Sequence, residues 1–541
     1  MDIKTTPEEI WEEYEKLTAY LTEENVFETV EKNEDFYRGK QWEGLADGPD
    51  NIAKPTMNTL QRIGKYQIAM LTSNDIGISI KSLVGSGEEK ELLDAISREA
   101  KDVVEQAKIL ETARLVVRDG YVAGVDYMHQ YFDPFFETGQ ESKGRIENEQ
   151  IDMRRMLFGN PYSADIQKQP YIIVALRQYV EQVKEEAEEL GVKNIDDIKP
   201  EADENYDDDD GETLVTVLLK YYKKKKEIPV TQTFIDELGN EFTIPLLDED
   251  GREVTKTVKT VHFIKCTKNV MIKEDVDLGY TRYPISRFGW DNRKSSYLFD
   301  TPMTWNIVNQ VFVNKIYSCM HEYSFKSAFP KRIYDQTKMD ISEYDENDDL
   351  GVAGIDLLGK FLDFSRMPDF SNQVIDLVKL TEGEMEKNMG INDAALGNVK
   401  PDNAQAIIAL QESAAVPLEI QRQNFYEMWE DTVRNIIDIM IASYGMRKIA
   451  GEDGEIVEID FEKLQGLNYR LNIDIGSSAQ YSEINQMNTI SSMLSSGQIN
   501  LKTFLKVCPD KFVPMKSELL KYAEEQEQKI AALQSQSLPT M

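Results

Sequence analysis

Two helical patterns that bracket a short acidic segment constrain the fold of this 541-residue chain more than any other feature. The first begins after Thr301, which can cap a helix whose first residue is Pro302, and the second runs from about Asn372 to Met389. The segment between them, residues 328–371, is acidic and strand-like. The second half of the chain is therefore predicted to contain two long helices separated by a small module.

The first of these helices is predicted to have two unlike faces. Apolar residues recur at intervals of three and four, which is helical spacing: Trp305, Val308, Phe312, Ile316 and Met320. The other face carries amide side chains: Asn306, Asn309, Gln310 and Asn314.

The N-terminal residues predict two helices that meet at an aromatic corner. Thr6-Pro7-Glu8-Glu9 is a capping box with proline at the first helical position, and a second helix from about Val26 should end at Gly39. The stretch "NEDFYRGKQWEGL", residues 33–45, lies at that end. It concentrates aromatic and basic side chains: Phe36, Tyr37, Trp42, Arg38 and Lys40. Such aromatics either stack on bases or sugars or lock one helix against the next, and the second interpretation is favoured.

Residues 54–298 predict an α+β region. A helix should restart at Lys54-Pro55-Thr56, a half-buried strand should span residues 76–82, and a long helix should occupy residues 88–118. Strands should follow, with a strand-rich insertion at residues 228–264.

Two charge blocks of opposite sign flank the apolar run from Leu214 to Leu219. "NYDDDDGE", residues 205–212, precedes the run, and "YYKKKK", residues 221–226, follows it. A solvated hairpin or strand edge explains both blocks. The whole chain carries a formal net charge of −36, so its surface repels phosphate and tight general binding of nucleic acid is not expected.

The longest helical pattern follows a turn-rich loop at residues 390–405. It runs from Ala406 to about Tyr444 and contains Pro417, which lacks an amide donor, so the helix should bend or break there. Beyond the proline, an apolar stripe predicts a buried face: Phe425, Met428, Trp429, Val433, Ile436, Ile437, Met440 and Tyr444.

No sequence pattern predicts a catalytic or metal site. His129, His262 and His321 are too scattered for metal-ligand spacing, and Gly85-Ser86-Gly87 lacks the rest of a phosphate-binding loop. The acidic runs do not fit a calcium loop, and no nucleophile elbow occurs. The three cysteines form no CxxC, so buried free thiols are expected. We therefore expect neither enzyme activity nor a cofactor.

Hydropathy predicts no membrane partner. No window approaches the roughly 18 consecutive apolar residues of a membrane span, and the first residues lack the order of a signal peptide. A protein made and kept in a cytosol is expected.

Six sequence motifs follow one another along the chain. They are "FYRGKQW"; "KPTMNTLQRI"; "DPF" and "GRIENE" leading to "NPYSADI"; "YPISRFGW"; "WNIVNQVFVNKIYS"; and "GINDAALGNVKPDNAQAIIALQESAAVPLEIQRQNFYEMWED". Together they resemble the portal, or head-to-tail connector, proteins of tailed double-stranded DNA bacteriophages. The resemblance spans roughly residues 33 to 530, and "DIGSSAQYSE" is similar to the start of the family's last domain.

The resemblance implies an α+β, helix-rich fold that assembles into a ring-shaped homo-oligomer, usually of twelve copies, around a central channel. It maps the regions of such a subunit as follows: wing 1–300 with a strand-rich insertion at 205–265, stem helices 301–327 and 372–391, clip 328–371, tunnel loop 392–405, bent wing helix and return strand 406–475, crown helices and tail 476–541. On this mapping the aromatic corner packs wing helices, away from DNA.

The same resemblance implies a function. The ring would stand at one capsid vertex as the channel for genome packaging and ejection, and as the docking platform for terminase and for tail or neck proteins. Implied partners are other copies of the chain, the terminase large subunit, the major capsid and scaffold proteins, a head–tail adaptor, and double-stranded DNA in the channel. The protein would be assembled in the host cytoplasm and located in the virion.

Two sets of site residues follow from the mapping. In the tunnel loop, Lys400, Asn398 and Asn403 are expected to line the DNA channel. In the clip, an acidic set is expected to dock the motor or neck: Asp340, Glu343, Asp345, Glu346, Asp348 and Asp349.

Two other classes of protein remain open at this point. An acidic metal-dependent hydrolase would need a carboxylate cluster whose activity is lost when one member is substituted. Another virion structural protein, such as a coat or tail adaptor, would lack the helix–clip–helix order.

Overall fold

The computed structural model divides the chain into two compact units. One comprises Met1–Thr72 and Ile80–Leu471, and the other comprises Ser73–Ser79 and Asn472–Met541. The residues that the structure describes are 3–42, 53–72, 76–82, 87–139, 143–201, 213–229, 231–235, 241–245, 254–328, 332–334, 362–364, 369–391, 416–450, 456–461, 469–475, 490–496, 499–500, 503–505, 508, 519 and 522.

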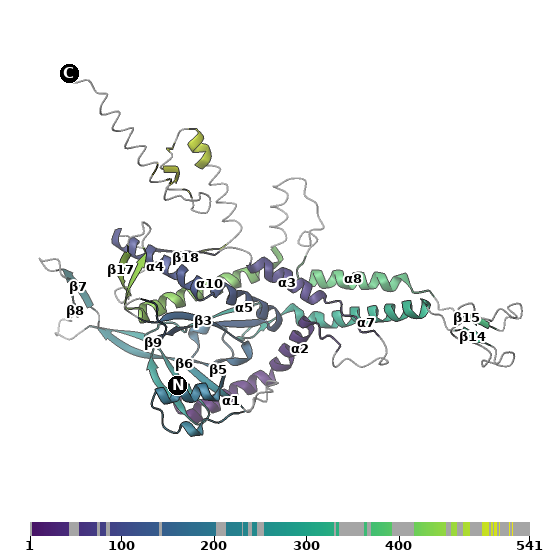
Figure 1. The fold of residues 1–541 in the computed structure, drawn as a ribbon, viewed down its shortest axis with the longest axis horizontal. Helices are drawn as coiled ribbons and strands as arrows, with labels where there is room; N and C mark the ends of the chain where they lie inside the picture. The colour runs from purple at the N-terminus through teal and green to yellow at the C-terminus, as the bar shows by residue number, and fades with distance from the viewer. Residues whose placement is uncertain are drawn as a thin grey trace, which may run out of the picture. The chain divides into compact units, whose positions relative to one another are not determined.

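In the first unit, most helices come before or after the main strands in the sequence (Figure 1). Their bounds are α1 Pro7–Glu23, α2 Val26–Arg38, α3 Thr59–Thr72, α4 Gly87–Gln106, α5 Ile109–Ala123, α6 Val180–Glu189, α7 Pro302–Ala328, α8 Asn372–Asn388 and α10 Glu419–Ser443. The two helices predicted on either side of the acidic segment are therefore present as α7 and α8.

Between α5 and α7 in the sequence, the chain forms two antiparallel sheets. A three-stranded sheet has the order β11-β2-β3, and a five-stranded sheet has the order β10-β9-β6-β5-β4. Their strands are β2 Val125–Asp133, β3 Arg145–Ile151, β4 Met156–Phe158, β5 Tyr171–Tyr179, β6 Leu214–Pro229, β9 Thr255–Cys266, β10 Met271–Asp277 and β11 Ile285–Gly289. The fold is α+β, as the sequence predicts.

The remaining strands pair two by two. They are β1 Ile76–Ser82 with β18 Tyr469–Ile475, β7 Thr231–Ile235 with β8 Glu241–Pro245, β12 Asp291–Asn292 with β13 Phe299–Asp300, β14 Arg332–Tyr334 with β15 Leu362–Phe364, and β16 Met446–Ala450 with β17 Ile456–Asp460.

The aromatic corner joins helices, as predicted. Helix α2 ends at Gly39, whose left-handed φ of 98° closes the helix. Phe36 and Tyr37 are buried, and the Trp42 indole Nε1 donates a hydrogen bond to the Pro55 carbonyl 3.1 Å away. The aromatic side chains at this corner therefore hold α2 against the segment that leads into α3.

Two helix boundaries differ from the sequence-based expectation. Helix α3 begins at Thr59 rather than near Pro55, because the Asn58 side chain accepts a hydrogen bond from the Gln61 amide and caps the helix there. The long helix predicted over residues 88–118 is two helices, α4 and α5. Lys108 between them adopts a left-handed φ of 49°, which a continuous right-handed helix cannot contain.

Helix α10 packs its apolar stripe against the three-stranded sheet. All eight residues predicted for this stripe are buried: Phe425, Met428, Trp429, Val433, Ile436, Ile437, Met440 and Tyr444. A short 3₁₀ turn at Val416–Leu418, which contains Pro417, leads into α10 at Glu419. Residues 406–415 of the predicted helix lie outside the described residues.

The lysine run lies in a partly open strand. β6 pairs with β5 only up to Tyr222, whereas its pairing with β9 continues to Pro229. Lys223 to Lys226 therefore lie where one edge of β6 has no strand partner in the described sheet, as predicted for the lysine block. The acidic block at residues 205–212 lies outside the described residues. Within the described ranges, no helix is long and apolar enough to cross a bilayer.

Candidate functional site

The amide face of α7 is buried against the start of α3. The Gln310 side-chain oxygen accepts hydrogen bonds from the backbone amides of Thr59 at 3.1 Å and Leu60 at 3.3 Å. Asn314 accepts from the Met57 amide at 3.0 Å, and its own amide group donates to Gln41 at 2.6 Å. Gln310 thus satisfies the first backbone donors of α3, which have no partner inside their own helix, and Asn314 holds Met57 just ahead of the helix.

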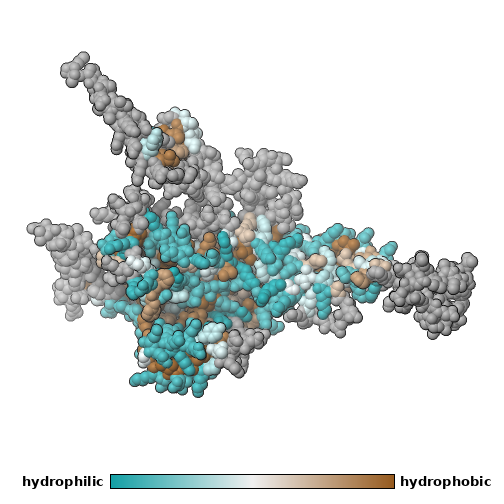
Figure 2. Space-filling view, viewed as in Figure 1, coloured by the Kyte–Doolittle hydropathy of each residue, from teal (hydrophilic) through white to brown (hydrophobic). Residues whose placement is uncertain are grey.

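Two residues of the predicted apolar stripe of α7 are exposed, and the other three, Phe312, Ile316 and Met320, are half-buried. Trp305 is 56% exposed and Val308 is 73% exposed, although both belong to the predicted apolar face. The buried side of α7 combines the amide side chains with apolar Met303, Ile307 and Val313. Figure 2 shows apolar residues at the surface over the hairpin that α7 forms with α8.

Helix α8 has the same arrangement on its outer side. Val378 and Met385 are buried, whereas Leu377 is 46% exposed and Leu380 is 60% exposed. The α7–α8 hairpin therefore carries exposed large apolar side chains on both of its helices, an arrangement typical of surfaces that contact another protein.

Polar contacts hold the base of α8 on α3. Arg62 forms an ion pair with Glu386 at 2.7 Å, and the Gln67 amide donates to the Met389 carbonyl at 2.5 Å. The C-terminal end of α8 is thus attached to α3. Because α7 also caps the start of α3, this one helix positions both helices of the hairpin.

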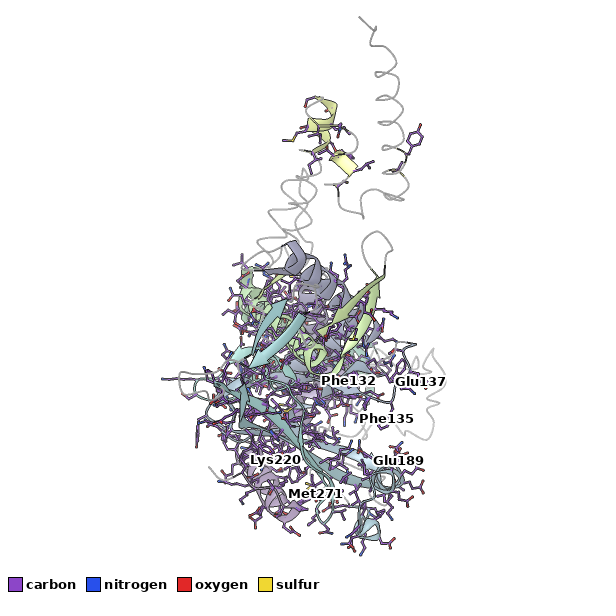
Figure 3. All side chains as sticks on the ribbon, turned by 90° about the vertical axis from the view of Figure 1, so that its left-hand side faces the viewer. Phe132, Phe135, Glu137, Glu189, Lys220 and Met271 are labelled. Carbon is purple, nitrogen blue, oxygen red and sulfur yellow. The ribbon has the colours of Figure 1, made fainter. Side chains whose placement is uncertain are left out.

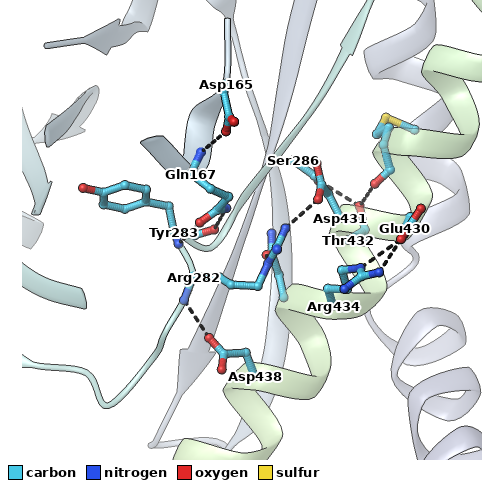
Figure 4. Close-up of polar contacts among 12 residues, drawn as sticks. Asp165, Gln167, Arg282, Tyr283, Ser286, Glu430, Asp431, Thr432, Arg434 and Asp438 are labelled. Carbon is cyan, nitrogen blue, oxygen red and sulfur yellow. Dashed lines mark hydrogen bonds and ion pairs between the residues drawn. The ribbon is translucent and has the colours of Figure 1, made fainter. Parts of the chain in front are cut away.

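A carboxylate latch attaches the connection between β10 and β11 to α10 (Figure 4). Asp438 accepts hydrogen bonds from the backbone amides of Thr281 at 2.7 Å and Arg282 at 2.9 Å, and from the Thr281 hydroxyl. Arg282 forms an ion pair with Asp431 at 2.5 Å. Burial raises the pKa of Asp431 and of Asp438, and the contacts with Arg282 oppose that rise. The latch joins the two sheets to α10.

The channel and docking residues expected from the sequence lie outside the described residues. Lys400, Asn398 and Asn403 lie outside the described residues. The acidic docking set also lies outside them: Asp340, Glu343, Asp345, Glu346, Asp348 and Asp349. Within the expected clip, the described part is the β14–β15 pair and the residues at either end.

The cysteines and histidines have structural surroundings. Cys266 and Cys508 are buried as expected, but Cys319 is exposed, because it lies on the outer face of α7. The two ring nitrogens of His129 contact Glu149 and the Tyr221 hydroxyl, each at 2.8 Å. In the described part of the chain, His, Cys, Asp and Glu side chains form no group of three or more that could hold a metal ion.

Sequence reasoning missed that the amide face of α7 would be buried. The available signal was the spacing of Asn306, Gln310 and Asn314, which recur every four residues along one side of the helix. It also missed the latch, since nothing near Asp438 in the sequence points to residue 282.

Comparison with known proteins gives one family. The model of the family described as phage P22-like portal protein matches residues 17–540, which is nearly the whole chain. No curated protein matches the sequence.

Proposed function

Because this chain belongs to the phage P22-like portal protein family, we propose that identical copies of it close into a ring of twelve around a DNA channel. The chain is a phage portal protein: a structural protein of the virion capsid that serves genome packaging and head–tail connection. The match gives no support to a metal-dependent hydrolase or to another class of virion structural protein.

The exposed apolar face of the α7–α8 hairpin is the observation that carries the ring proposal. In a ring, each copy uses two different surfaces to contact its two neighbours. Trp305 and Val308 on α7, with Leu377 and Leu380 on α8, supply apolar surface that one copy leaves uncovered. Packing against neighbouring copies would bury this surface, at about 25 cal/mol for each Å² removed from water.

Electron microscopy and sedimentation of purified protein test the ring. Wild-type protein should form hollow rings, and the double variant Trp305→Ser with Val308→Ser should remain largely dissociated at the same concentration. Leu115→Ser, at an exposed apolar position on α5, is the control and should still form rings. Unchanged rings in the double variant would show that this face of α7 is not a subunit contact.

We assign the regions by the family mapping. Residues 1–300 would form the wing, α7 and α8 the two stem helices, residues 328–371 the clip, and residues 476–541 the crown. The helix bounds Pro302–Ala328 and Asn372–Asn388 support the stem assignment, since they match the expected stem helices closely.

The tunnel loop is proposed to contact DNA through Lys400. Twelve copies of this lysine would surround the channel, each making a weak and salt-screened contact with a phosphate, and Asn398 and Asn403 could donate hydrogen bonds to phosphate as well. Lys400→Glu should reduce packaged genome length or retention in particles whose rings assemble normally. Normal filling and retention would remove Lys400 from the mechanism.

The acidic clip residues are proposed to dock the packaging motor. A basic surface on the terminase large subunit or on a head–tail adaptor would complement these six carboxylates: Asp340, Glu343, Asp345, Glu346, Asp348 and Asp349. Reversing Asp345, Glu346 and Asp348 to lysine should weaken motor binding while rings stay intact. Normal packaging by that variant would indicate that the segment is only a solvated surface.

A further inference from the structure

Two lysines face each other on the open extension of the five-stranded sheet. Lys225 of β6 pairs in register with Lys259 of β9, so their side chains leave the same face of the sheet, and both residues are exposed. Neither has an ion pair or a hydrogen-bonded side-chain partner within the described residues. Like charges placed directly opposite each other destabilise a sheet unless a negative group lies near them. We refer to Lys225 and Lys259 as the basic pair.

Positive charge also accumulates beside this pair. Lys223 lies two residues from Lys225 on the same side of β6, and its ammonium lies over the Tyr283 ring at 4.6 Å. Burial, together with the positive charges of Arg282 and Lys259, lowers the pKa of Lys223 to about 8. Asp438 and Asp165 oppose this lowering, and Glu227 lies two residues beyond Lys225 on the same face of β6. Lysine and arginine side chains still outnumber these carboxylates here, in a chain whose formal net charge is −36.

An acidic ridge lies further along the same sheet face, on α6. Val183 and Ala187 bury one side of this helix, and the exposed side carries four carboxylates: Glu181, Glu185, Glu188 and Glu189. Figure 3 shows Glu189 at the surface. None of the four has an ion-pair partner among the described side chains.

The basic pair and the acidic ridge do not neutralise each other within one copy. Glu186, on the inner side of α6, contacts Lys265 of β9, which lies on the same sheet face as Lys259. Six residues of extended strand separate Lys265 from Lys259, a distance of about 20 Å at roughly 3.3 Å per residue. This exceeds the screening length of about 8 Å at physiological salt.

We propose that, in the assembled ring, the basic pair of each copy contacts the acidic ridge of the next copy. This inference rests on the ring proposed above and adds a second contact, distinct from the α7–α8 hairpin. A head-to-tail ring needs two unlike, complementary surfaces on every subunit, and these surfaces have opposite charge and different positions on one sheet face. Their charge would fix which way round neighbouring copies meet and would speed their encounter.

Charge reversal with rescue tests the contact. In the variant Lys225→Glu with Lys259→Glu, both surfaces are acidic, so neighbouring copies should repel each other. The protein concentration needed for half-assembly in about 0.1 M salt should rise by about tenfold, as expected when two or more ion pairs become repulsions. Reversing all four ridge carboxylates to lysine in this variant (Glu181, Glu185, Glu188 and Glu189) exchanges the signs of the two surfaces and should restore assembly.

The matched control changes the same charge elsewhere. Lys32→Glu with Lys101→Glu alters two exposed lysines on α2 and α4 and should leave the half-assembly concentration within about twofold of wild type. Wild-type assembly by the Lys225/Lys259 variant would overturn the inference and leave the ring standing. Lost assembly without rescue by the α6 reversals would show that α6 is not the partner. Failure of the wild-type chain to form rings would instead overturn the ring proposal.

Discussion

A single buried carboxyl shows how strongly one residue depends on its surroundings. Asp126 is 1% exposed at the start of β2, and the Gln150 amide group donates to it and to Asp119, each at 2.5 Å. Burial raises the pKa of Asp126 well above its ordinary value of 3.8, and the negative charge of Asp119 adds to the rise. The folded protein therefore favours the protonated form of Asp126.

This carboxyl should reduce stability as pH rises. Below about pH 4, Asp126 is protonated in the folded and in the unfolded protein. As pH rises above about 4, this carboxyl ionises in the unfolded chain but stays protonated in the folded one. The free energy of unfolding therefore falls, in total by about 1.4 kcal/mol for each pH unit by which the folded-state pKa is raised. Asp126→Asn removes this loss. In urea unfolding, the free energy of unfolding of the variant relative to wild type should be higher at pH 7 than at pH 4. An equal change in both proteins would contradict the assignment.

One glycine permits the close approach of α3 and α5. A Cβ atom added at Gly64 would lie 2.4 Å from the buried ring of Tyr121, whose hydroxyl donates to the Leu60 carbonyl. Gly64→Ala should therefore lower the free energy of unfolding by about 1–3 kcal/mol. Gly383→Ala on α8 is the control: its Cβ meets no atom within 4 Å, so the helix should gain about 0.5–1 kcal/mol. Equal effects in thermal unfolding would refute the packing argument.

At the scale of an element, α7 performs two tasks with opposite faces. Its amides replace the missing intrahelical partners at the start of α3, and its apolar residues remain available for another copy. Amphipathicity alone does not say which face is buried, because polar groups can be buried when each finds a hydrogen-bond partner.

The two faces should respond differently to truncation. Gln310→Ala leaves the Thr59 and Leu60 amides buried without their acceptor and should cost about 1–3 kcal/mol of stability in a single copy. Trp305→Ala should change single-copy stability by less than about 0.5 kcal/mol. Denaturation below the assembly concentration measures both. A larger loss for Trp305→Ala would mean that the tryptophan packs within its own subunit.

At the scale of the whole molecule, the chain belongs to the portal family, and its described residues contain no cluster of His, Cys, Asp and Glu that could hold a metal ion. The net charge of −36 on each copy would also keep DNA from binding the ring walls tightly.

Assembly should therefore be independent of metal ions and nucleotides. Rings formed in EDTA, with no nucleotide added, should have the same diameter and copy number as rings formed with Mg²⁺ and ATP, because neither is needed to complete a subunit contact. Mass measurement of intact rings and electron microscopy check this. Dissociation by the chelator, reversed by adding the metal back, would reveal a site in the chain that we have not identified.

The sequence by itself determined the family and most of the helices and strands. Local patterns suffice for these: Thr6 and Thr301 cap helices, Gly39 ends one, Pro417 precedes another, and the α10 stripe is buried as its spacing predicts. The tertiary structure alone decided which side of α7 faces inward, where α4 gives way to α5, and how Asp438 captures residues 281 and 282. The first and third depend on partners more than 100 residues away, and the second on a left-handed conformation of Lys108, and no short-range pattern records either.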